Sequence, residues 1–184
     1  IPLKPETLDL LKSASTSTIA TLLYKKGFRN CYVQGVAALS PRSERMVGPA
    51  FTLRYIVSRE DTDPIEAFRE PDHPQRVAIE TCPPGHVLVM DCRQDATAAS
   101  AGSILLTVFA ARPSAPTNLT RHHAVDVNVA VSCGGAAVYP GDIIVGDGDG
   151  VMVIPRHLAC DIAREAMPME LFEGFVLEEV RGGQ

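Results

Sequence analysis

Three short runs rich in β-branched residues lie close together in the last third of the chain: Val127–Val131, Ile143–Val145 and Val151–Ile154. Residues typical of tight turns separate them, among them Pro140-Gly141-Asp142 and Asp147-Gly148-Asp149-Gly150. Strand-sized apolar runs between such residues predict a meander in a β-rich layer. We expect the rest of the chain to cover and close this sheet.

Helices and strands are also predicted ahead of this meander. Ser15-Thr16-Ser17 offers an N-cap to a helix that carries Ile19, Leu22 and Leu23 at helical spacing and ends near Gly27. Phe51–Val57 alternates apolar and polar residues, as a half-buried strand does. The remaining expected elements are a helical turn at Pro5–Leu11, strands at Val33–Leu39 and Val87–Asp91, a loop with one helical turn at Arg59–Pro74, and a helix at Gln75–Thr81.

The stretch after Asp91 is harder to interpret. A loop is followed by a helix of small residues that includes Ile104, Leu105 and Leu106, and this helix runs directly into the strand-like Val108–Ala110. Connections between a helix and a strand usually take about 2–6 residues, so this junction has no room. Further on we expect a proline-rich loop at Arg112–Asn118, an element of either kind at His122–Val125, a helix at Arg156–Met167, and a second helical piece that starts at Pro168 and carries Met169, Phe172 and Val176 as an apolar stripe.

Length and composition are those of an ordinary soluble protein, and we expect one domain over residues 1–184. The apolar runs fall short of the roughly 20 residues of a membrane span, and no signal peptide is visible. A net charge of −5 without a basic tract argues against a nucleic-acid partner. The five cysteines are scattered without a CxxC pair, which favours buried free thiols in a reducing cytoplasm.

The strongest candidates for chemistry are Asp91, Arg93 and Asp95, at the carboxyl end of a predicted strand. Carboxylates suit Mg²⁺ or Mn²⁺, and an arginine suits a carboxylate substrate. A solvated loop is the alternative. Gly102-Ser103 could present free backbone N–H groups to an anion.

Other polar groups give weaker signals. His122 and His123 are adjacent, so on a strand they face opposite sides; either one of them lines a site or both are surface residues. Asp147-Gly148-Asp149-Gly150 is superficially similar to a calcium loop but lacks the bidentate glutamate, which predicts a β-turn with exposed aspartates. Glu170 and Glu173 are predicted to lie on the surface of the last helix.

Four segments together resemble the RraA-like family: TSTIATLLYKKGF near the start, VGPAFTLR (Val47–Arg54), VSCGG (Val131–Gly135) and PGDIIVGDGDGVMVIP (Pro140–Pro155). That family includes the regulator of ribonuclease E activity and the class II 4-hydroxy-4-methyl-2-oxoglutarate aldolases, which also decarboxylate oxaloacetate. The resemblance implies a compact α/β fold with a β/β/α swivelling core and a mixed sheet covered by helices. It also implies a homotrimer or a hexamer of two trimers, with a Mg²⁺- or Mn²⁺-dependent pocket at a subunit interface.

The family's catalytic signature is only partly present. Its glycine matches Gly102, so the amides of Ser103, Ile104 and Leu105 are expected to bind the substrate carboxylate together with Arg93. The Arg-Asp pair that follows about twenty residues later in the family is absent, because Arg121 is followed by a histidine. From the resemblance we therefore expect a strand, the Arg-Asp loop and a helix to be missing from the sequence near residues 106–108.

Two functions follow from the resemblance. The first is a cytoplasmic, metal-dependent lyase that acts on a small pyruvate-derived 2-oxo acid, with Asp91 and Asp95 holding the metal directly or through water. The second is a non-catalytic regulator that binds a protein partner, such as a ribonuclease, through its acidic surface. An intact Arg-Asp pair would favour the lyase, and a true deletion would favour the regulator.

Overall fold

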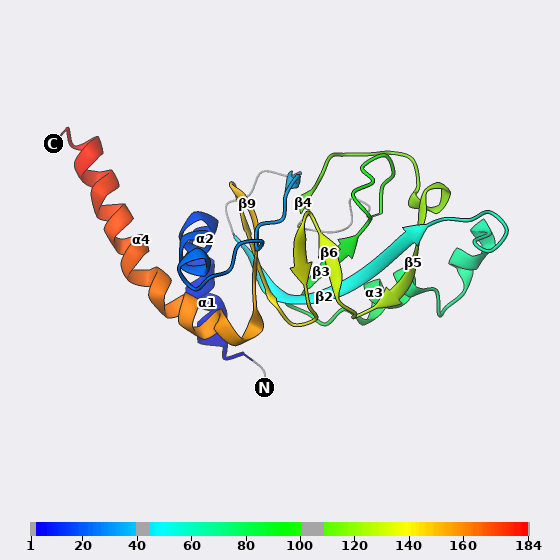
Figure 1. The fold of residues 1–184 in the computed structure, drawn as a ribbon, viewed down its shortest axis with the longest axis horizontal. Helices are drawn as coiled ribbons and strands as arrows, with labels where there is room; N and C mark the ends of the chain where they lie inside the picture. The colour runs from blue at the N-terminus through cyan, green and yellow to red at the C-terminus, as the bar shows by residue number, and fades with distance from the viewer. Residues whose placement is uncertain (1–2, 40–44, 101–108, 184) are drawn as a thin grey trace.

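The computed structural model describes residues 3–39, 45–100 and 109–183 (Figure 1). The helices and strands follow one another as α1 (Pro5–Ser13), α2 (Thr16–Lys25), β1 (Ala37–Ala38), β2 (Met46–Val57), η1 (Ile65–Arg69), α3 (Pro74–Thr81), β3 (Val87–Asp91), β4 (Phe109–Ala110), η2 (Asn118–Thr120), β5 (His122–Val127), β6 (Val131–Cys133), β7 (Ala136–Val138), β8 (Ile143–Asp147), β9 (Gly150–Ile154), η3 (Arg156–Leu158) and α4 (Ala159–Arg181). The η elements are 3₁₀ turns.

The long strand β2 organises the main sheet. Its first residues pair antiparallel with β8, which in turn pairs antiparallel with β9. Its second half pairs parallel with β3, from Ala50 opposite Val87 onward, and antiparallel with β5, ending with Val57 opposite His122. The sheet is therefore mixed, and the predicted α/β fold class is confirmed.

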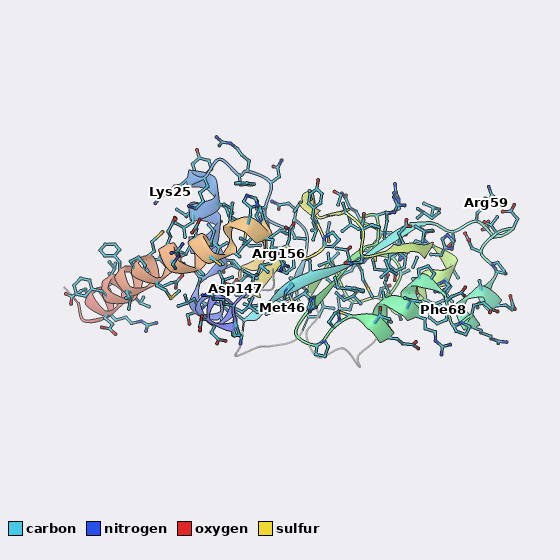
Figure 2. All side chains as sticks on the ribbon, turned by 90° about the horizontal axis from the view of Figure 1, so that it is seen from below. Lys25, Met46, Arg59, Phe68, Asp147 and Arg156 are labelled. Atoms are coloured by element: carbon cyan, nitrogen blue, oxygen red, sulfur yellow. The ribbon has the colours of Figure 1, made fainter. Side chains whose placement is uncertain are left out.

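Helices cover the two ends of this sheet. At one end α1, α2 and α4 pack over β8 and β9, where Leu11, Ile19 and Ile162 are fully buried. At the other end α3 lies against β2 and β5, and Leu53, Tyr55 and Ala78 form a smaller core. Figure 2 shows Met46 and Asp147 toward the helical end and Arg59 and Phe68 at the opposite end. The end of β3 thus lies between two packed regions.

Several predicted elements are confirmed. The helix with the Ser15 cap is α2, and the Ser15 hydroxyl accepts a hydrogen bond from the amide of Thr18 at 3.2 Å. Gly27 follows the helix with φ of +90°, the conformation that ends many helices and that glycine adopts without strain. The strand Val87–Asp91 has the predicted bounds, and the expected helix at Gln75–Thr81 begins one residue earlier.

Two predicted strands were wrong in extent. Within Val33–Leu39 only β1 forms, because Gly35 takes φ of +74° and turns the chain away from β9. The first meander run is divided between β5 and β6, because Asn128 takes φ of +57° and donates its amide hydrogen to the carbonyl of Thr52 instead. The hairpin of β6 and β7 was missed, since its strands have three residues each and carry little periodicity.

The predicted break at Pro168 was also wrong. One helix, α4, runs through the proline for 23 residues. An interior proline removes one helical hydrogen bond and costs about 3 kcal/mol, so the strong helix formers on both sides outweigh it. Of the expected apolar stripe only Met169 packs against the helical core, whereas Phe172 is 67% and Val176 41% exposed. In Figure 1 this half of α4 extends away from the rest of the molecule.

The predicted junction between the small-residue helix and β4 lies outside the described residues, which resume at Phe109. The same holds for Gly102, Ser103, Ile104 and Leu105. The residues just before them form no helix: Thr97, Ala98 and Ser100 are bends, and Ala99 forms an isolated β-bridge with Thr117. Phe109 pairs with Ala38, which places β4 beside β1 as a two-stranded sheet.

Candidate functional site

The end of β3 leads into a turn with an uncommon backbone. Arg93 has φ of +55° and Gln94 has φ of +61°, and neither is glycine. Side chains disfavour this left-handed conformation by roughly 1–2 kcal/mol per residue. Such strain persists only where the surroundings enforce it, and it is concentrated at functional sites. Asp91, Arg93 and Asp95 lie in or beside this turn.

Asp91 accepts two backbone hydrogen bonds. One carboxylate oxygen accepts from the amide of Arg93 at 3.0 Å and the other from the amide of Ser132 at 3.3 Å. The carboxylate thereby stabilises the strained turn and links it to β6. Within the described residues the guanidinium of Arg93 forms no ion pair, which leaves it available to a ligand's carboxylate.

Asp95 is held more tightly. One of its oxygens accepts from the amide of Thr97 at 2.8 Å and from the Thr97 hydroxyl, and the other accepts from Arg121 Nε at 3.2 Å. These hydrogen bonds, with Thr97 first and Arg121 after it, lower the pKa of Asp95 to about 2. Asp95 is therefore a carboxylate at any physiological pH and too weak a base to remove a proton from a substrate.

The segment Asp95–Ser100, here called the strap, runs beside the proline-rich loop that precedes β5. That loop contacts it in four places. Arg112 Nε donates to the carbonyl of Ala96 and the Ser114 hydroxyl to that of Thr97, both at 2.8 Å; the amide of Ala99 donates to the carbonyl of Pro116 at 2.8 Å, and the amide of Asn118 to that of Ala99 at 3.3 Å. The strap ends two residues before Gly102.

A buried polar network holds the end of the strap. Gln75 Nε2 donates to the carbonyl of Ser100 at 3.1 Å, and Asn118 Nδ2 donates to Gln75 Oε1 at 2.9 Å. The Ser100 hydroxyl accepts from Cys92 Sγ at 3.1 Å and lies 2.8 Å from His122 Nε2. Gln75 and Asn118 are about 95% buried, and His122 is 2% exposed. The network joins α3, η2, β5 and the end of β3.

The two histidines face opposite sides of β5, as predicted. His122 points into the smaller core, where its ring lies edge-on to Tyr55 with centroids 4.9 Å apart. His123 lies beside Asp63, with Nδ1 2.9 Å from Oδ1. The interpretation of both as surface residues was wrong for His122. Strand alternation predicted that the two differ but not which one is buried.

The described residues do not assemble a metal centre by themselves. They contain no group of three or more histidine, cysteine, aspartate or glutamate side chains placed to hold an ion. Asp91 and Asp95 each accept hydrogen bonds from their own turn. No step can be derived through a metal from these two carboxylates, and a dependence on Mg²⁺ or Mn²⁺ stays a prediction.

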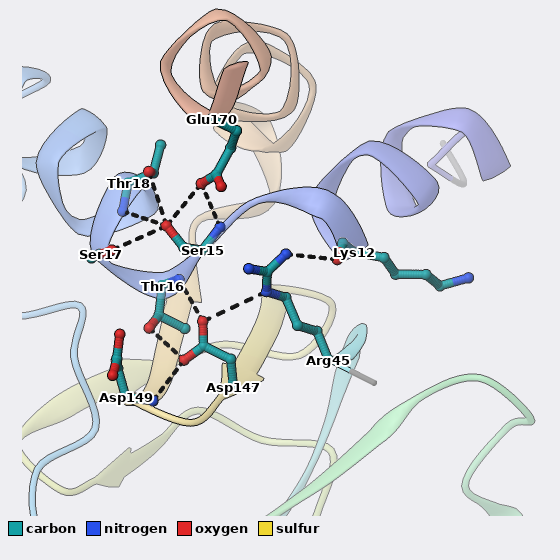
Figure 3. Close-up of polar contacts among 9 residues, drawn as sticks. All are labelled: Lys12, Ser15, Thr16, Ser17, Thr18, Arg45, Asp147, Asp149 and Glu170. Atoms are coloured by element: carbon teal, nitrogen blue, oxygen red, sulfur yellow. Dashed lines mark hydrogen bonds and ion pairs between the residues drawn. The ribbon is translucent and has the colours of Figure 1, made fainter. Parts of the chain in front are cut away.

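A second polar cluster lies at the helical end of the molecule (Figure 3). Asp147, at the end of β8, accepts hydrogen bonds from the amide and hydroxyl of Thr16 at 2.8 and 2.7 Å and from the amide of Asp149 at 3.0 Å, and Arg45 Nε lies 3.7 Å away. The predicted β-turn is present, but the expected exposure was wrong for Asp147, whose side chain is 12% exposed. Its role is to hold the start of α2.

Glu170 of α4 completes this cluster. One oxygen accepts from the amide of Ser15 at 2.7 Å and from the Ser15 hydroxyl at 2.8 Å. Burial acts to raise the pKa of Glu170, but the hydrogen bonds from Ser15 and the charge of Arg45 outweigh it and lower the pKa. Glu170 is thus a half-buried contact between α4 and the start of α2, where the sequence predicted a surface residue.

The cysteines are free, as predicted, but none is fully buried: Cys160 is exposed and the other four are half-buried. Burial raises the pKa of Cys133 to about 11 and also raises that of Cys92. Both are therefore thiols at neutral pH, and neither is an activated nucleophile. No helix within the described ranges is long and apolar enough to cross a membrane.

A mixed sheet with helices at both ends, and a strained turn at the end of a parallel strand, define an α/β protein of the aldolase/RraA type. The sequence matches the model of this family, described as RraA-like (Aldolase/RraA), in two segments, residues 16–115 and 106–153. The match covers well over half of the chain. The protein belongs to the RraA-like family, as the resemblance implied.

Individual relatives agree with this assignment. A "putative 4-hydroxy-4-methyl-2-oxoglutarate aldolase" of Halalkalibacterium halodurans is 29% identical over 151 residues, and the match covers 67% of this chain and 66% of that protein. This chain thus spans just under two thirds of that relative's length. Since 67% of 184 residues is fewer than 151, some aligned positions have no counterpart here.

Two solved structures share the fold. The structure of an uncharacterized protein from Pseudomonas syringae matches with a TM-score of 0.80 at 21% sequence identity. The match covers 100% of this chain and 92% of the Pseudomonas chain. RraAS2 of Streptomyces coelicolor, described as an unusual member of the RNase ES inhibitor RraA protein family, has a TM-score of 0.79 at 23% identity, with 96% and 98% covered. At these identities the likeness establishes the fold alone.

Proposed function

We propose that this protein is a divalent-metal-dependent lyase that cleaves a carbon–carbon bond in a pyruvate-derived 2-oxo acid, of the 4-hydroxy-4-methyl-2-oxoglutarate aldolase or oxaloacetate decarboxylase type. The observation that carries the proposal is the strained turn at Arg93 and Gln94, which gathers charged side chains at the carboxyl end of β3. Ligands of open α/β sheets commonly bind at such strand ends. The relative from H. halodurans supports the reaction class.

The charges near this turn suit an acid substrate. Arg93 has no ion pair among the described residues and lies beside the strap that leads to Gly102. An arginine binds a carboxylate through paired, charge-assisted hydrogen bonds. Cleavage of the carbon–carbon bond leaves a pyruvate enolate. A positively charged side chain nearby, such as that of Arg93, would stabilise the negative charge of the enolate until its carbon atom takes up a proton.

A divalent cation, when bound, would polarise the 2-keto oxygen as a Lewis acid. The described residues do the remaining work of orientation. Asp91 fixes the turn through two backbone amides, and Asp95 fixes the start of the strap through Thr97 and Arg121. The proton donor and acceptor are not among these groups, because the pKa of Asp95 is about 2.

The second function is a regulator that binds another protein. Two observations favour it: the Arg-Asp pair of the aldolases is absent from the sequence, and the described residues form no metal centre. RraAS2, with the same fold, is described as a member of an RNase inhibitor family. An acidic surface, consistent with the net charge of −5, would then contact the partner.

Pyruvate release separates the two functions. The protein is incubated with oxaloacetate and with 4-hydroxy-4-methyl-2-oxoglutarate, with Mg²⁺ or Mn²⁺ and then with excess EDTA. The lyase predicts release that stops with EDTA and returns with either metal, and at least tenfold weaker catalysis by Arg93→Gln. The matched control is Arg59→Gln, whose exposed guanidinium pairs with Asp61 in the loop that follows β2. No release with either substrate and either metal rejects the lyase.

A further inference from the structure

The direction of the hydrogen bonds around Ser100 defines the state of His122. Cys92 donates to the Ser100 hydroxyl, so the one hydroxyl hydrogen of Ser100 is free to point at His122 Nε2, 2.8 Å away. A hydroxyl has one donor and two acceptor sites. His122 Nε2 is then the acceptor, and Nδ1 carries the ring proton.

That ring proton makes no hydrogen bond. His122 Nδ1 is buried and has no partner within the described residues, and the same is true of the Tyr55 hydroxyl beside it. An unpaired buried polar group costs about 1–3 kcal/mol, which an apolar residue of similar size would not incur. Packing alone therefore does not account for a histidine at this position. Among the described residues, the hydrogen bond of its side chain is the one with Ser100.

The surroundings of His122 keep it uncharged. The groups that face it are Tyr55 from β2, Cys92 after β3, and Ser100, Asp95 and Arg121 from the strap and η2. Burial lowers the pKa of His122; the charge of Asp95 opposes this and that of Arg121 adds to it. Protonation of His122 would add a hydrogen to Nε2, which could then no longer accept the hydrogen bond from the Ser100 hydroxyl.

We propose that His122 is a positioning residue that, through the Ser100 hydroxyl, fixes the last residues of the strap and with them the approach to Gly102. The backbone of Ser100 is held from the other side by Gln75, itself fixed by Asn118. The chain just before Gly102 is thus held between α3 and β5. The consequence for substrate binding rests on the proposed lyase function, whereas the fixing of the strap does not.

Hydrogen exchange of the strap amides tests the first part without any need for activity. The amides of Asp95, Thr97 and Ala99 are each hydrogen-bonded and report on the strap. In His122→Leu we expect these amides to exchange about tenfold faster, since the contact that orders Ser100 is lost. His122→Gln keeps an acceptor near the place of Nε2 and should stay within about twofold of the native protein, which separates the hydrogen bond from mere filling of space.

The matched control is His123→Gln, on the same strand but facing away, which should leave strap exchange unchanged. If His122→Leu does not fold, Ser100→Ala removes the same hydrogen bond from the half-buried side. The proposal is overturned if the strap amides exchange at the native rate in His122→Leu or, where that variant does not fold, in Ser100→Ala. It is also overturned if they exchange equally fast in His122→Gln and His122→Leu.

The link to the site is judged separately. If the native protein releases pyruvate, the KM for the oxo acid should rise at least fivefold in His122→Leu, because the amides expected to bind the carboxylate begin at Ser103, three residues beyond the strap. An unchanged KM with a loosened strap refutes the link alone. If the native protein releases no pyruvate, the lyase fails while the exchange experiment still decides the role of His122.

Discussion

Replacing Asp147 by alanine should destabilise the protein through the loss of its contacts with the start of α2. The carboxylate accepts three hydrogen bonds at 2.7–3.0 Å, two of them from Thr16 at the first residue of α2. Its side chain is 12% exposed, so water replaces these bonds poorly in the variant.

The magnitude follows from the groups left without a partner. A hydrogen bond to a charged group contributes about 1.5–3 kcal/mol, and an anion at a helix N-terminus adds about 0.3–1 kcal/mol. Because the three bonds share one carboxylate, they are not additive. We expect Asp147→Ala to lower the free energy of unfolding by about 2–4 kcal/mol, and Asp147→Asn, which keeps one oxygen acceptor, by roughly half as much.

Urea denaturation followed by circular dichroism measures these differences, provided that the dependence on urea keeps its slope. Asp149→Ala is the matched control: the same turn, one charge removed, and a side chain that forms no hydrogen bond within the described residues. It should change stability by less than about 0.5 kcal/mol. A loss below 1 kcal/mol in Asp147→Ala, or equal losses in the two alanine variants, would show that the cluster does not hold α2 as described.

Three further predictions concern pH, metal and assembly. Burial lowers the pKa of His122 and of His73 in the folded protein below the ordinary 6.5. As the pH falls below 6.5, the unfolded chain therefore binds more protons than the folded protein, which favours unfolding. The urea concentration at the midpoint of unfolding should decrease from pH 7.5 to pH 5, and it should decrease less steeply in His122→Gln. The pKa of Asp95 near 2 adds a second loss, seen only as pH falls from 3.8 toward 2. Titration calorimetry with Mn²⁺ should show binding that Asp91→Asn weakens at least tenfold; heats equal to those of dilution would exclude a metal site at this turn. Light scattering should give the mass of a trimer or hexamer, since the second half of α4 exposes Phe172 and Leu171; a mass near 19.7 kDa at micromolar concentration would contradict this.

The sequence predicted the fold where local signals act alone. Ser15 before an amphipathic run defined α2, and an apolar run between a Pro-Gly turn and charged residues defined β3. Prediction from the sequence failed where the backbone conformation of a single residue, or contacts between distant residues, determine the structure. Gly35 and Asn128 take positive φ and end strands that periodicity would extend. The helix α4 continues through Pro168 although proline usually starts or ends a helix.

The candidate site was predicted in part for the same reason. Asp91, Arg93 and Asp95 follow one strand directly, so their proximity needs no knowledge of the tertiary structure. The strap network joins Gln75, Ser100 and His122 from three elements, and no spacing in the sequence brings such residues together. Glu170 was assigned to the surface because its partner, Ser15, lies 155 residues away in the sequence.

The last prediction concerns the chain itself near residues 105–109. We expect the natural protein to contain a further segment here, of roughly two dozen residues or more by the family resemblance. The predicted helix includes Ile104, Leu105 and Leu106, and only Thr107 separates it from the strand predicted at Val108–Ala110, where about 2–6 connecting residues are usual. The family model matches in two segments that meet at residues 106–115, and the alignment to the aldolase-like relative contains positions that this chain lacks.

The structure gives a third reason. Strand β3 pairs with β2 on one side, and all five of its residues are half-buried although four of them are Val, Leu, Val and Met. An apolar edge strand left partly open is a liability that folds usually cover. A further strand beside β3 would cover it, and the family places the missing strand just after the Gly102 helix. The pattern is that of a core strand without its neighbour.

Peptide mapping of the protein purified from its source decides the question. If the chain is continuous, trypsin must release the single peptide that follows Arg93 and ends at Arg121, QDATAASAGSILLTVFAARPSAPTNLTR, because trypsin does not cleave the Arg112–Pro113 bond. If the segment exists, that peptide is absent, the intact mass exceeds the 19.7 kDa of this sequence, and new peptides appear, one that ends at the arginine and one that begins at the aspartate of the family's Arg-Asp pair. Detection of the continuous peptide at the abundance of its neighbours would establish a real deletion. The lyase would then lack its principal catalytic pair, and the regulator would become the better account of the protein.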